Sequence, residues 1–379
     1  MFMQNAKAVM LSVTLAAGAL LISGCGAAED AGLPPAAELS EAPETVIQSP
    51  ALTDTAPPEE SGPLRIFTRD ELKAELQAAI SGLRQPRSMD ISAAGLSGTP
   101  ELDAKNLYYE LLSQYPELKY AYDMSATAEG GMLSCRFSFM PYKTGDFDES
   151  RDYIEVSSLT GLIETAQASI GSEAASIRIT NPELDPDDMN RALQQAGGAY
   201  ILCALSPDGT EIKYSPAMGM TMEDCLAALR EAEALAEGIV SGLITESMGQ
   251  RERAELLYAY ITENVRYDQR YYSDPGSLPY ESRTATGALR DKLAICGGYS
   301  HALKLLFERA GIPCWNISGS SRGENHMWNL AQLDGQWLWF DATADRGLSP
   351  ERGLRHFALA ELDAQQYEWD EAQLRIIQG

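Results

Sequence analysis

Residues 326–341 read HMWNLAQLDGQWLWFD, and their pattern restricts this part of the chain to one kind of local fold. Apolar and polar residues alternate on both sides of Asp334-Gly335, which is among the strongest sequence signals for a β-hairpin. If these two residues form the loop, His326 faces Thr343, and Asp341 lies two residues from that partner on the same face. This diagonal separation is about 7 to 8 Å between backbones, within reach of a His to Asp hydrogen bond. A four-residue loop keeps this arrangement, whereas a three-residue loop breaks it.

Residues 293–307, LAICGGYSHALKLLF, predict a buried helix that begins near Cys296. The helix N-terminus favours a thiolate at Cys296, and its free N–H groups could stabilise an oxyanion. Glycines are costly in a helix, so Gly297 and Gly298 predict that something approaches the backbone closely there. The apolar positions recur at the spacing of one helix face, and a glycine and a proline close the segment: Tyr299, Ala302, Leu303, Leu306, Ala310, Gly311 and Pro313.

Cys296, His326 and Asp341 together suggest nucleophilic catalysis. Taken singly, a lone cysteine usually packs as a small residue, a strand histidine can be a surface residue, and an aspartate can cap a strand end. Taken together, the carboxylate would fix the imidazole tautomer, the imidazole would deprotonate Cys296, and the helix N-terminus would stabilise the thiolate. The other two histidines, His301 and His356, are expected to be structural.

The composition excludes several other functions. Asp and Glu number 55 against 29 Lys and Arg, a net charge of −26, so the chain is a poor candidate for binding nucleic acid or anionic lipid by charge. No CxxC pair occurs, and the three histidines give no zinc-ligand spacing, so neither a metal nor a cofactor is expected. Four cysteines read as small buried residues whose disulfide pairing, if any, cannot be deduced: Cys135, Cys203, Cys225 and Cys314.

The N-terminus predicts a secreted and lipid-anchored protein. Residues 1–24 hold one Lys, a short apolar run and then small residues, which is the layout of a signal peptide. The sequence ISGC at residues 22–25 resembles the bacterial lipobox, which implies cleavage before Cys25 and lipidation of its thiol. The alternative is a plain secretory signal with a chance cysteine. Residues 25–63 are rich in proline and are expected to form a disordered linker, which leaves the folded part outside the cytoplasm and tethered to the cell membrane.

The rest of the chain divides into two predicted domains. Residues 64–245 mix helix and strand as a smaller α/β domain, with helices expected at 68–83, 103–114 and 222–244 and a strand at 131–140. The tetrapeptide PELD occurs at 100–103 and 182–185, each time before a helical stretch and a Tyr-led strand. Two copies of a small α/β unit would explain this, and four matched residues could also be chance. Residues 246–379, with a helix expected at 251–265, form the predicted catalytic domain, and the first domain is expected to be structural or substrate-positioning.

The C-terminal domain resembles the transglutaminase-like superfamily from about residue 251 to 370. The similar segments are TENVRYD at 262–268, ICGGYSHALKLLFERAGIPCWNISG at 295–319, NHMWNLAQLDGQWLWFDAT at 325–343, and a tail that contains HFALAELDAQQYEWD. The resemblance implies a papain-like core in which a cysteine-bearing helix packs on an antiparallel sheet, so the fold class is α+β. It also implies Cys296 as the nucleophile, His326 as the base and Asp341 as the residue that orients the base.

Three positions depart from the pattern of bacterial relatives. Gly297 stands where Gln often follows the cysteine, Met327 where Ala usually follows the histidine, and Ala344 where Trp is common. None of these removes a member of the triad, but the first leaves the second oxyanion donor open. This donor could be the Tyr267 hydroxyl, the Trp328 indole or an amide that the sequence does not identify. Gly297 is also predicted to support the oxyanion site. Tyr267 ranks first because the TENVRYD segment lies near the active site in the family.

The resemblance implies a cysteine enzyme that acts on amide bonds of peptides or proteins through a thioester. Acyl transfer to water would make it a peptidase or amidase, and transfer to an amine would make it a transglutaminase; relatives do both. Hydrolysis is slightly favoured because water outnumbers amines outside the cell. The competing hypothesis is a non-catalytic cell-surface binding or scaffolding lipoprotein of the same fold, against which the intact triad argues. The expected partners are a peptide or protein substrate, cell-wall associated among the candidates, and the membrane through the lipid anchor.

Overall fold

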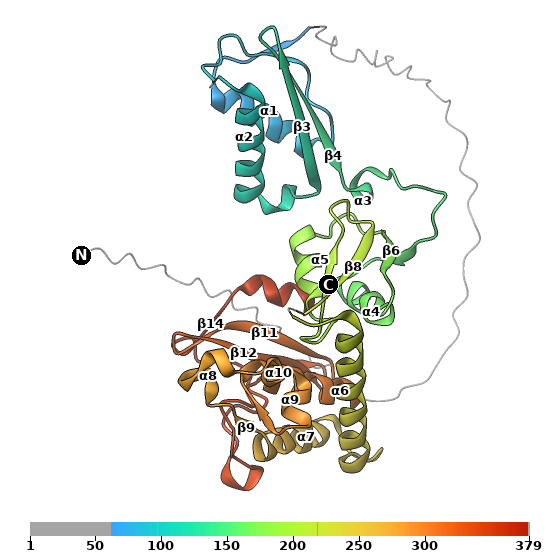
Figure 1. The fold of residues 1–379 in the computed structure, drawn as a ribbon, viewed down its shortest axis with the longest axis vertical. Helices are drawn as coiled ribbons and strands as arrows, with labels where there is room; N and C mark the ends of the chain where they lie inside the picture. Colours follow the sequence, from blue (N-terminus) through green and yellow to red (C-terminus); the bar gives the residue numbers. More distant parts are fainter. Residues whose placement is uncertain (1–61, 97, 218, 378–379) are drawn as a thin grey trace, which may run out of the picture. The chain divides into compact units, whose positions relative to one another are not determined.

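The computed structural model describes residues 62–96, 98–217 and 219–377. The predicted signal peptide, the lipidation site at Cys25 and nearly all of the predicted linker lie outside the described residues. Within the described ranges, no helix is long and apolar enough to cross a membrane. This part of the chain contains three four-stranded sheets, and helices accompany each of them (Figure 1).

The first sheet is formed by residues 64–139 and has the strand order β1-β2-β4-β3. Its elements are β1 (Leu64–Arg65), α1 (Arg69–Ser81), β2 (Met89–Asp90), α2 (Pro100–Gln114), a 3-10 turn (Pro116–Leu118), β3 (Ala121–Glu129) and β4 (Met132–Phe139). Thr68 begins α1 by accepting a hydrogen bond from the backbone N–H of Glu71 at 3.1 Å. Leu72, Leu76 and Ile80 are fully buried on one face of α1, as their spacing predicts.

The second sheet repeats the topology of the first. It follows α3 (Pro141–Thr144) and consists of β5 (Ile154–Val156), α4 (Leu159–Ala168), β6 (Ala174–Ile179), α5 (Pro186–Leu193), β7 (Ile201–Leu205) and β8 (Glu211–Pro216). The order is β5-β6-β8-β7, and in both sheets the first pair is parallel and the others antiparallel. Pro100 is the first residue of α2, whereas Asp185 is the N-cap of α5. The two PELD segments therefore occupy different helix positions, and the shared topology, not the tetrapeptide, relates the two sheets.

The C-terminal part holds the segments of the predicted site. Two long helices come first, α6 (Met222–Leu243) and α7 (Gln250–Asn264), and both lie close to their predicted ranges. They are followed by β9 (Arg266–Tyr267), α8 (Arg270–Ser273), 3-10 turns at Pro275–Ser277 and Tyr280–Arg283, α9 (Ala285–Leu289) and β10 (Leu293–Ala294). These short elements lie in the stretch that leads from α7 to the cysteine.

The third sheet carries the cysteine-bearing helix α10 (Cys296–Arg309). Its strands are β11 (Cys314–Ser321), β12 (Glu324–Leu333), β13 (Gln336–Phe340) and β14 (Tyr367–Trp369), with 3-10 turns at Pro350–Arg352 and Glu371–Ile377. The order is β13-β12-β11-β14, all pairs are antiparallel, and α10 packs on β12 and β11. This confirms the predicted α+β class with a cysteine-bearing helix on an antiparallel sheet.

The β12–β13 hairpin has the predicted two-residue loop. Leu333 pairs with Gln336, and Asp334 and Gly335 both have positive φ, 50° and 82°. Such a loop matches the right-handed twist of the flanking strands, and Gly and Asp tolerate this backbone conformation best. The register is the one that puts His326 and Asp341 on the same face.

One face of α10 is buried, as its apolar spacing predicts. Its members are at most 6% exposed: Tyr299, Ala302, Leu303, Leu306 and Ala310. The described cysteines are all free thiols, and four of them are buried, namely Cys135, Cys203, Cys225 and Cys314. Cys296 differs from these four because it is only half-buried.

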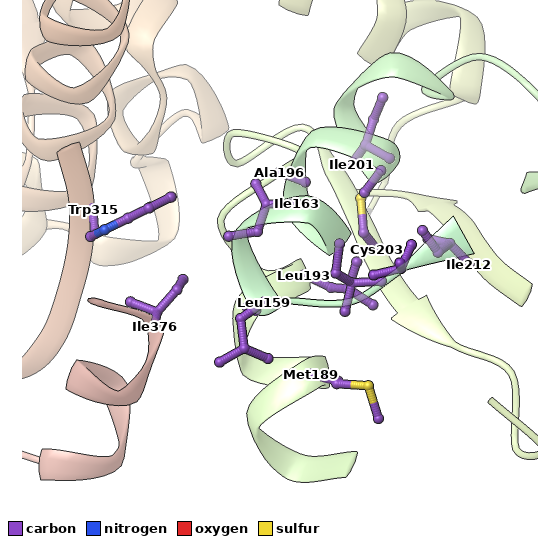
Figure 2. Packing of buried hydrophobic residues seen from close by; sticks show 14 of the residues in the cluster. Leu159, Ile163, Met189, Leu193, Ala196, Ile201, Cys203, Ile212, Trp315 and Ile376 are labelled. Atoms are coloured by element: carbon purple, nitrogen blue, oxygen red, sulfur yellow. The ribbon is translucent and has the colours of Figure 1, made fainter. Parts of the chain in front are cut away.

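The second sheet unit and the third sheet share a core. Figure 2 shows Trp315 of β11 and Ile376 near the C-terminus facing Leu159 and Ile163 of α4. All four belong to one cluster of buried apolar side chains, and each is at most 8% exposed. The α/β unit of residues 154–216 is therefore packed against the sheet that carries His326.

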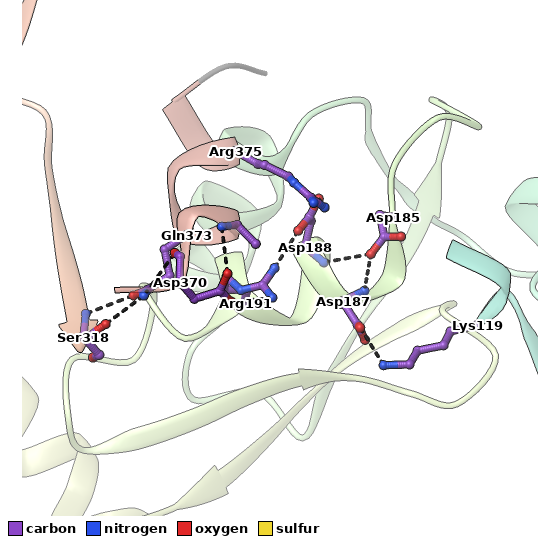
Figure 3. A network of polar contacts seen from close by, with 10 residues as sticks. Lys119, Asp185, Asp187, Asp188, Arg191, Ser318, Asp370, Gln373 and Arg375 are labelled. Atoms are coloured by element: carbon purple, nitrogen blue, oxygen red, sulfur yellow. Dashed lines mark hydrogen bonds and ion pairs between the residues drawn. The ribbon is translucent and has the colours of Figure 1, made fainter. Parts of the chain in front are cut away.

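Two glutamine side chains add polar contacts to this core. Gln195 accepts from the backbone N–H of Asn316 at 3.0 Å and donates to the carbonyl of the same residue at 2.9 Å. Gln373 holds Ser318 of the same strand in the same way, at 2.9 and 2.8 Å (Figure 3). Two ion pairs join α5 to the C-terminal segment, Arg191 with Asp370 and Arg375 with Asp188.

Candidate active site

Cys296 is the first residue of α10. Ile295 precedes it as the cap and makes no side-chain hydrogen bond to the helix, so the cap leaves the first N–H groups of α10 without a side-chain acceptor. Just upstream, β10 pairs in parallel with β9, and Ala294 lies opposite Tyr267. This pairing brings the TENVRYD segment beside the strand that leads into Cys296.

The two glycines after Cys296 are explained by close packing within the chain. A Cβ at Gly298 would lie 2.7 Å from the carbonyl oxygen of Ser282 and 3.0 Å from that of Thr284. A Cβ at Gly297 would lie 3.3 Å from the carbonyl oxygen of Arg283. The close approach that the glycines predict is therefore made by the chain's own residues 282–284.

Asp268 fixes this covering segment in place. Its buried carboxylate accepts a hydrogen bond from the Ser282 hydroxyl at 2.6 Å and two from the Arg270 guanidinium at 2.9 and 2.7 Å. Arg270 and Ser282 outweigh the effect of burial and lower the pKa of Asp268 to about 2, so the carboxylate is ionised at neutral pH. Ser282 of the covering segment is thereby hydrogen-bonded to the residue that follows β9.

His326 and Asp341 form the pair that the hairpin register predicts. His326 Nε2 lies 2.7 Å from Asp341 Oδ2, and the Asp341 side chain is only 1% exposed. Asp341 also accepts from the Tyr367 hydroxyl at 2.8 Å and from the Ala344 backbone N–H at 2.9 Å. Three donors thus surround a buried carboxylate and hold it in one orientation, which in turn fixes the imidazole ring.

The pair shifts the protonation of both partners. Burial alone would lower the pKa of His326, but hydrogen bonds to Asp341 and to the Cys296 thiol outweigh it and raise the pKa to about 9. Burial likewise opposes ionisation of Asp341, yet its hydrogen bond with His326 and its charge interaction with that ring leave the pKa lowered. The imidazole is therefore hydrogen-bonded to Asp341 and interacts electrostatically with the nearby Cys296 thiol.

The two side chains predicted as oxyanion donors are placed differently. Tyr267 lines the same cleft as His326, and burial followed by the nearby Cys296 raises the pKa of its hydroxyl, which keeps it a neutral donor. Trp328 instead stacks on the His326 ring, with ring centres 5.8 Å apart. Its indole N–H is buried and has no partner in the described part of the chain, so it does not reach the cleft, which corrects the prediction for Trp328.

A cleft of about 620 Å³ opens at the His–Asp pair. Its wall combines β11 and β12, the segment after β13, and two tyrosines from the stretch before α10. Charged and aromatic side chains make up much of this wall: Tyr267, Tyr272, Arg322, Glu324, His326, Asp341, Arg346, Arg355, His356 and Tyr367. Within the described ranges, no group of three or more His, Cys, Asp or Glu side chains is placed to hold a metal ion.

The contacts of His301 and His356 fit the structural roles expected for them. His301 Nδ1 accepts from the Asn316 amide at 3.0 Å, and burial together with Lys304 lowers the pKa of His301 to about 4, so the ring is neutral. His356 Nδ1 lies 2.9 Å from Oδ1 of the fully buried Asp345.

Tyr367 is a site residue that the sequence did not reveal. It lies on β14, which pairs with β11 and is separated from β13 by a long irregular stretch. No turn signal links Tyr367 to Asp341, so register could not be deduced as it was for the hairpin. A Tyr and a Trp two residues apart in the tail were the one available hint of a short strand with a buried face.

Comparison with known proteins agrees with this geometry. Residues 233–342 match the model of the transglutaminase-like superfamily, and this range includes Cys296, His326 and Asp341. The chain contains a transglutaminase-like domain. The kyphoscoliosis peptidases of Homo sapiens and Mus musculus are each 25% identical to the chain, over 137 and 122 residues. These matches cover 33% and 29% of the chain but only 20% and 18% of the relatives, so the chain spans about a fifth of their length.

Two solved structures are also similar to the chain. A TGase is 14% identical with a TM-score of 0.28, covering 73% of this chain and 78% of that one. The periplasmic domain of TgpA from Pseudomonas aeruginosa is 18% identical with a TM-score of 0.23, covering 40% and 65%. The transglutaminase-like domain, with its half-buried cysteine on α10, supports membership of a cysteine-dependent enzyme family of papain-like fold.

Proposed function

We propose that the protein is a cysteine-dependent acyl-transfer enzyme that cleaves or transfers amide bonds of peptides or proteins through a thioester. One observation carries the proposal: the His326 imidazole is hydrogen-bonded at 2.7 Å to a buried Asp341 that has two further donors, and it interacts with the Cys296 thiol. A nucleophile, a base and an orienting carboxylate in contact are what acyl transfer by cysteine needs.

The proton transfers follow from the contacts. Asp341 holds Nε2 of His326, so Nδ1 is the nitrogen left to exchange a proton with the thiol. A raised imidazole pKa favours the imidazolium and thiolate pair at neutral pH. The thiolate attacks the amide carbon, the C–N bond breaks, and the leaving amine takes the proton from the imidazolium, which leaves a thioester on Cys296. Water or an amine then attacks the thioester, His326 accepts its proton, and the thiol is restored as the acid or new amide departs.

We infer that two groups stabilise the oxyanion of each step. The backbone N–H groups at the start of α10 adjoin Cys296, and the helix dipole favours negative charge there. The Tyr267 hydroxyl is the proposed second donor, because the residue lines the cleft and interacts with Cys296. These steps use only side chains and amides of the chain, and no cofactor takes part.

Hydrolysis is the favoured outcome, with a peptidase or amidase as the result. Water is the abundant acceptor outside the cell, where the predicted signal peptide and lipidated Cys25 would place the enzyme. A transglutaminase would need a bound amine to compete with water at the thioester. Peptide or protein substrates at the cell surface, cell-wall peptides among them, are the proposed partners.

The test is the pH dependence of Cys296 alkylation by iodoacetamide in the full-length chain. Wild type should label readily at pH 6, where an unassisted thiol is mostly protonated, and His326→Ala should slow labelling there on the order of 10-fold or more. Asp341→Asn should give an intermediate rate, because the ring remains but loses its orienting charge. Circular dichroism checks that both variants are folded. Identical pH profiles in wild type and His326→Ala would leave no Cys–His pair, and the non-catalytic binding or scaffolding lipoprotein would then be the better hypothesis.

A further inference from the structure

The cleft at the candidate active site carries a charge opposite to that of the chain. Its wall presents three arginines, Arg322, Arg346 and Arg355, and one exposed acidic residue, Glu324. Over the whole sequence, 55 acidic residues outnumber 29 basic ones. A typical patch of this surface would therefore carry a net negative charge. The exposed side chains of the cleft carry a net positive charge instead.

None of these guanidinium groups pairs with a carboxylate in the described part of the chain. Arg322 donates to the amide oxygen of Gln366 at 3.2 and 3.1 Å. Arg346 donates to a backbone carbonyl at 2.7 Å and stands over the Tyr267 ring at 5.4 Å. Within the same residues the Arg355 side chain makes no hydrogen bond or ion pair; its backbone N–H alone binds, to Asp345.

Several arginines elsewhere in the described chain form ion pairs with carboxylates, and others do not. Ion pairs of 3.0 Å or less join arginines to acidic residues across the described surface: Arg69 with Glu110, Arg84 with Glu75, Arg178 with Glu149, and Arg290 with Glu231. The three arginines of the cleft, in contrast to these, leave their positive charge without a paired carboxylate among the described residues. Glu324, the exposed acidic residue of the wall, already accepts a hydrogen bond from the Tyr272 hydroxyl at 3.0 Å.

Free guanidinium groups in a concave site are suited to one ligand chemistry. A planar guanidinium binds a carboxylate through two parallel hydrogen bonds, and a cleft lined by one sign of charge concentrates ligands of the opposite sign. We propose that this cleft takes an acyl donor that bears a carboxylate near the scissile carbonyl, recognised by Arg346 and Arg355. The inference rests on the proposed function, since the acyl donor is the substrate of Cys296.

Arg346 and Arg355 both line this cleft, and both come from the segment after β13. Arg346 also packs on Tyr267, the proposed oxyanion donor, which places a bound carboxylate close to the reacting carbonyl. Arg322 lies on the turn between β11 and β12 and adds positive potential from another wall. A purely structural role would explain the contact of Arg346 with its backbone carbonyl, but it would not explain Arg355.

The first test needs no substrate. Full-length protein is alkylated at pH 7 with iodoacetate or iodoacetamide, which differ in charge but little in size, and label is counted on the tryptic peptide of residues 293–304, which contains Cys296 as its one cysteine. The cleft should raise the iodoacetate to iodoacetamide rate ratio, and Arg346→Gln and Arg355→Gln should each lower it about three- to tenfold at low salt. Arg352→Gln removes the same charge from an exposed arginine outside the cleft wall and should leave the ratio unchanged.

The outcomes of this test separate the two proposals. If the iodoacetate to iodoacetamide rate ratio is equal in wild type, Arg346→Gln and Arg355→Gln, the proposal of a cationic cleft is overturned. This holds whatever the reactivity of Cys296. A ratio lowered equally by Arg352→Gln would also overturn it, because net charge alone would then be responsible. The loss of the Cys–His pair is judged instead from the His326→Ala pH profile, which does not involve the charge of the reagent.

The second test distinguishes the sources of the carboxylate. Matched fluorogenic peptides carry Glu or Gln beside the scissile bond, each with a free or an amidated C-terminus. The proposal predicts a higher kcat/KM for peptides with a carboxylate, and Arg355→Gln should remove that preference while sparing the neutral peptide. A preference for Glu assigns a side-chain carboxylate, and a preference for the free terminus assigns a terminal one. Equal rates on charged and neutral peptides would overturn the inference, and no turnover of any peptide would count against the proposed function alone.

Discussion

His326 is buried beside a carboxylate, and its raised pKa sets how stability should respond to pH. The folded value is about 9, whereas an unfolded histidine titrates near about 6.5. Because the folded state holds the proton more tightly, the stabilisation is fully present below about pH 6.5 and is lost as the pH rises through about 9. The pKa of Asp341 is lowered, so its contribution is present above its unfolded value of about 3.9 and is lost as the pH falls through the folded value.

We therefore expect the free energy of unfolding to fall between about pH 6.5 and pH 9.5, by at most about 3 kcal/mol. Urea denaturation at fixed ionic strength measures it. His326→Gln, which lacks the titrating ring, should lack this decrease and provides the control for other groups that titrate in the range. Parallel curves for wild type and His326→Gln would mean that the imidazole does not bind its proton more tightly in the folded state.

Single residues of the site could be predicted where a turn or a helix end fixes their position. The two-residue turn fixed the parity of His326 and Asp341, and the helix start singled out Cys296. Trp328 was wrongly predicted as a donor because the strand pattern shows that the ring is buried but not where its N–H points. Tyr367 lies on a three-residue strand that follows a long irregular stretch, and the arginines of the cleft lie in turns and irregular segments, so a sequence offers no register for them.

At the scale of secondary-structure elements, the start of α10 should be intolerant of any added side chain. Gly298→Ala would put a Cβ 2.7 Å from the carbonyl oxygen of Ser282, and backbone cannot move aside as a flexible side chain can. We expect a loss of about 3 kcal/mol in unfolding free energy and slower alkylation of Cys296. Urea denaturation and the iodoacetamide rate measure the two effects.

Gly238→Ala is the matched control within a helix. Gly238 is an exposed residue inside α6, and a Cβ there meets nothing within 4 Å. The same substitution should therefore stabilise the protein by about 0.5 to 1 kcal/mol, since alanine loses less backbone entropy. A neutral or stabilising Gly298→Ala would show that residues 282–284 do not cover the helix start as closely as described.

The elements with strong periodicity were found from sequence, and the short ones were not. The long helices α6 and α7 and the hairpin follow patterns repeated over many residues, and their bounds agree closely with prediction. No helix or strand was predicted for the stretch between α7 and α10, yet it contains β9, α8, α9 and β10. Pieces of two to five residues have too few positions for a period to show, and tertiary contacts such as Asp268 with Ser282 decide them.

At the scale of the whole molecule, glutamine side chains link distant segments by bonding to the backbone N–H and carbonyl of a strand residue, as a neighbouring strand would. Gln195 holds the backbone of Asn316 in β11, and Gln85 makes the same two bonds to Phe137 in the first sheet, at 2.7 and 2.9 Å. A glutamine in a connecting segment gives no sequence signal for such a contact. The attachment of the second sheet unit to the third sheet was accordingly beyond sequence reasoning, although each unit's own helices and strands were partly predictable.

All five tryptophans lie on strands of the third sheet, so their fluorescence reports that sheet alone: Trp315, Trp328, Trp337, Trp339 and Trp369. Gln195→Ala should lower the unfolding free energy seen by tryptophan fluorescence by about 1 to 2 kcal/mol, because it leaves a backbone N–H and carbonyl of β11 without partners. Gln85→Ala removes the same kind of contact from the first sheet and should leave the fluorescence transition in place while circular dichroism detects its loss. An equal fluorescence shift in both variants would mean that the sheets unfold as one unit, and no shift in either would mean that Gln195 does not couple the second sheet unit to the third sheet.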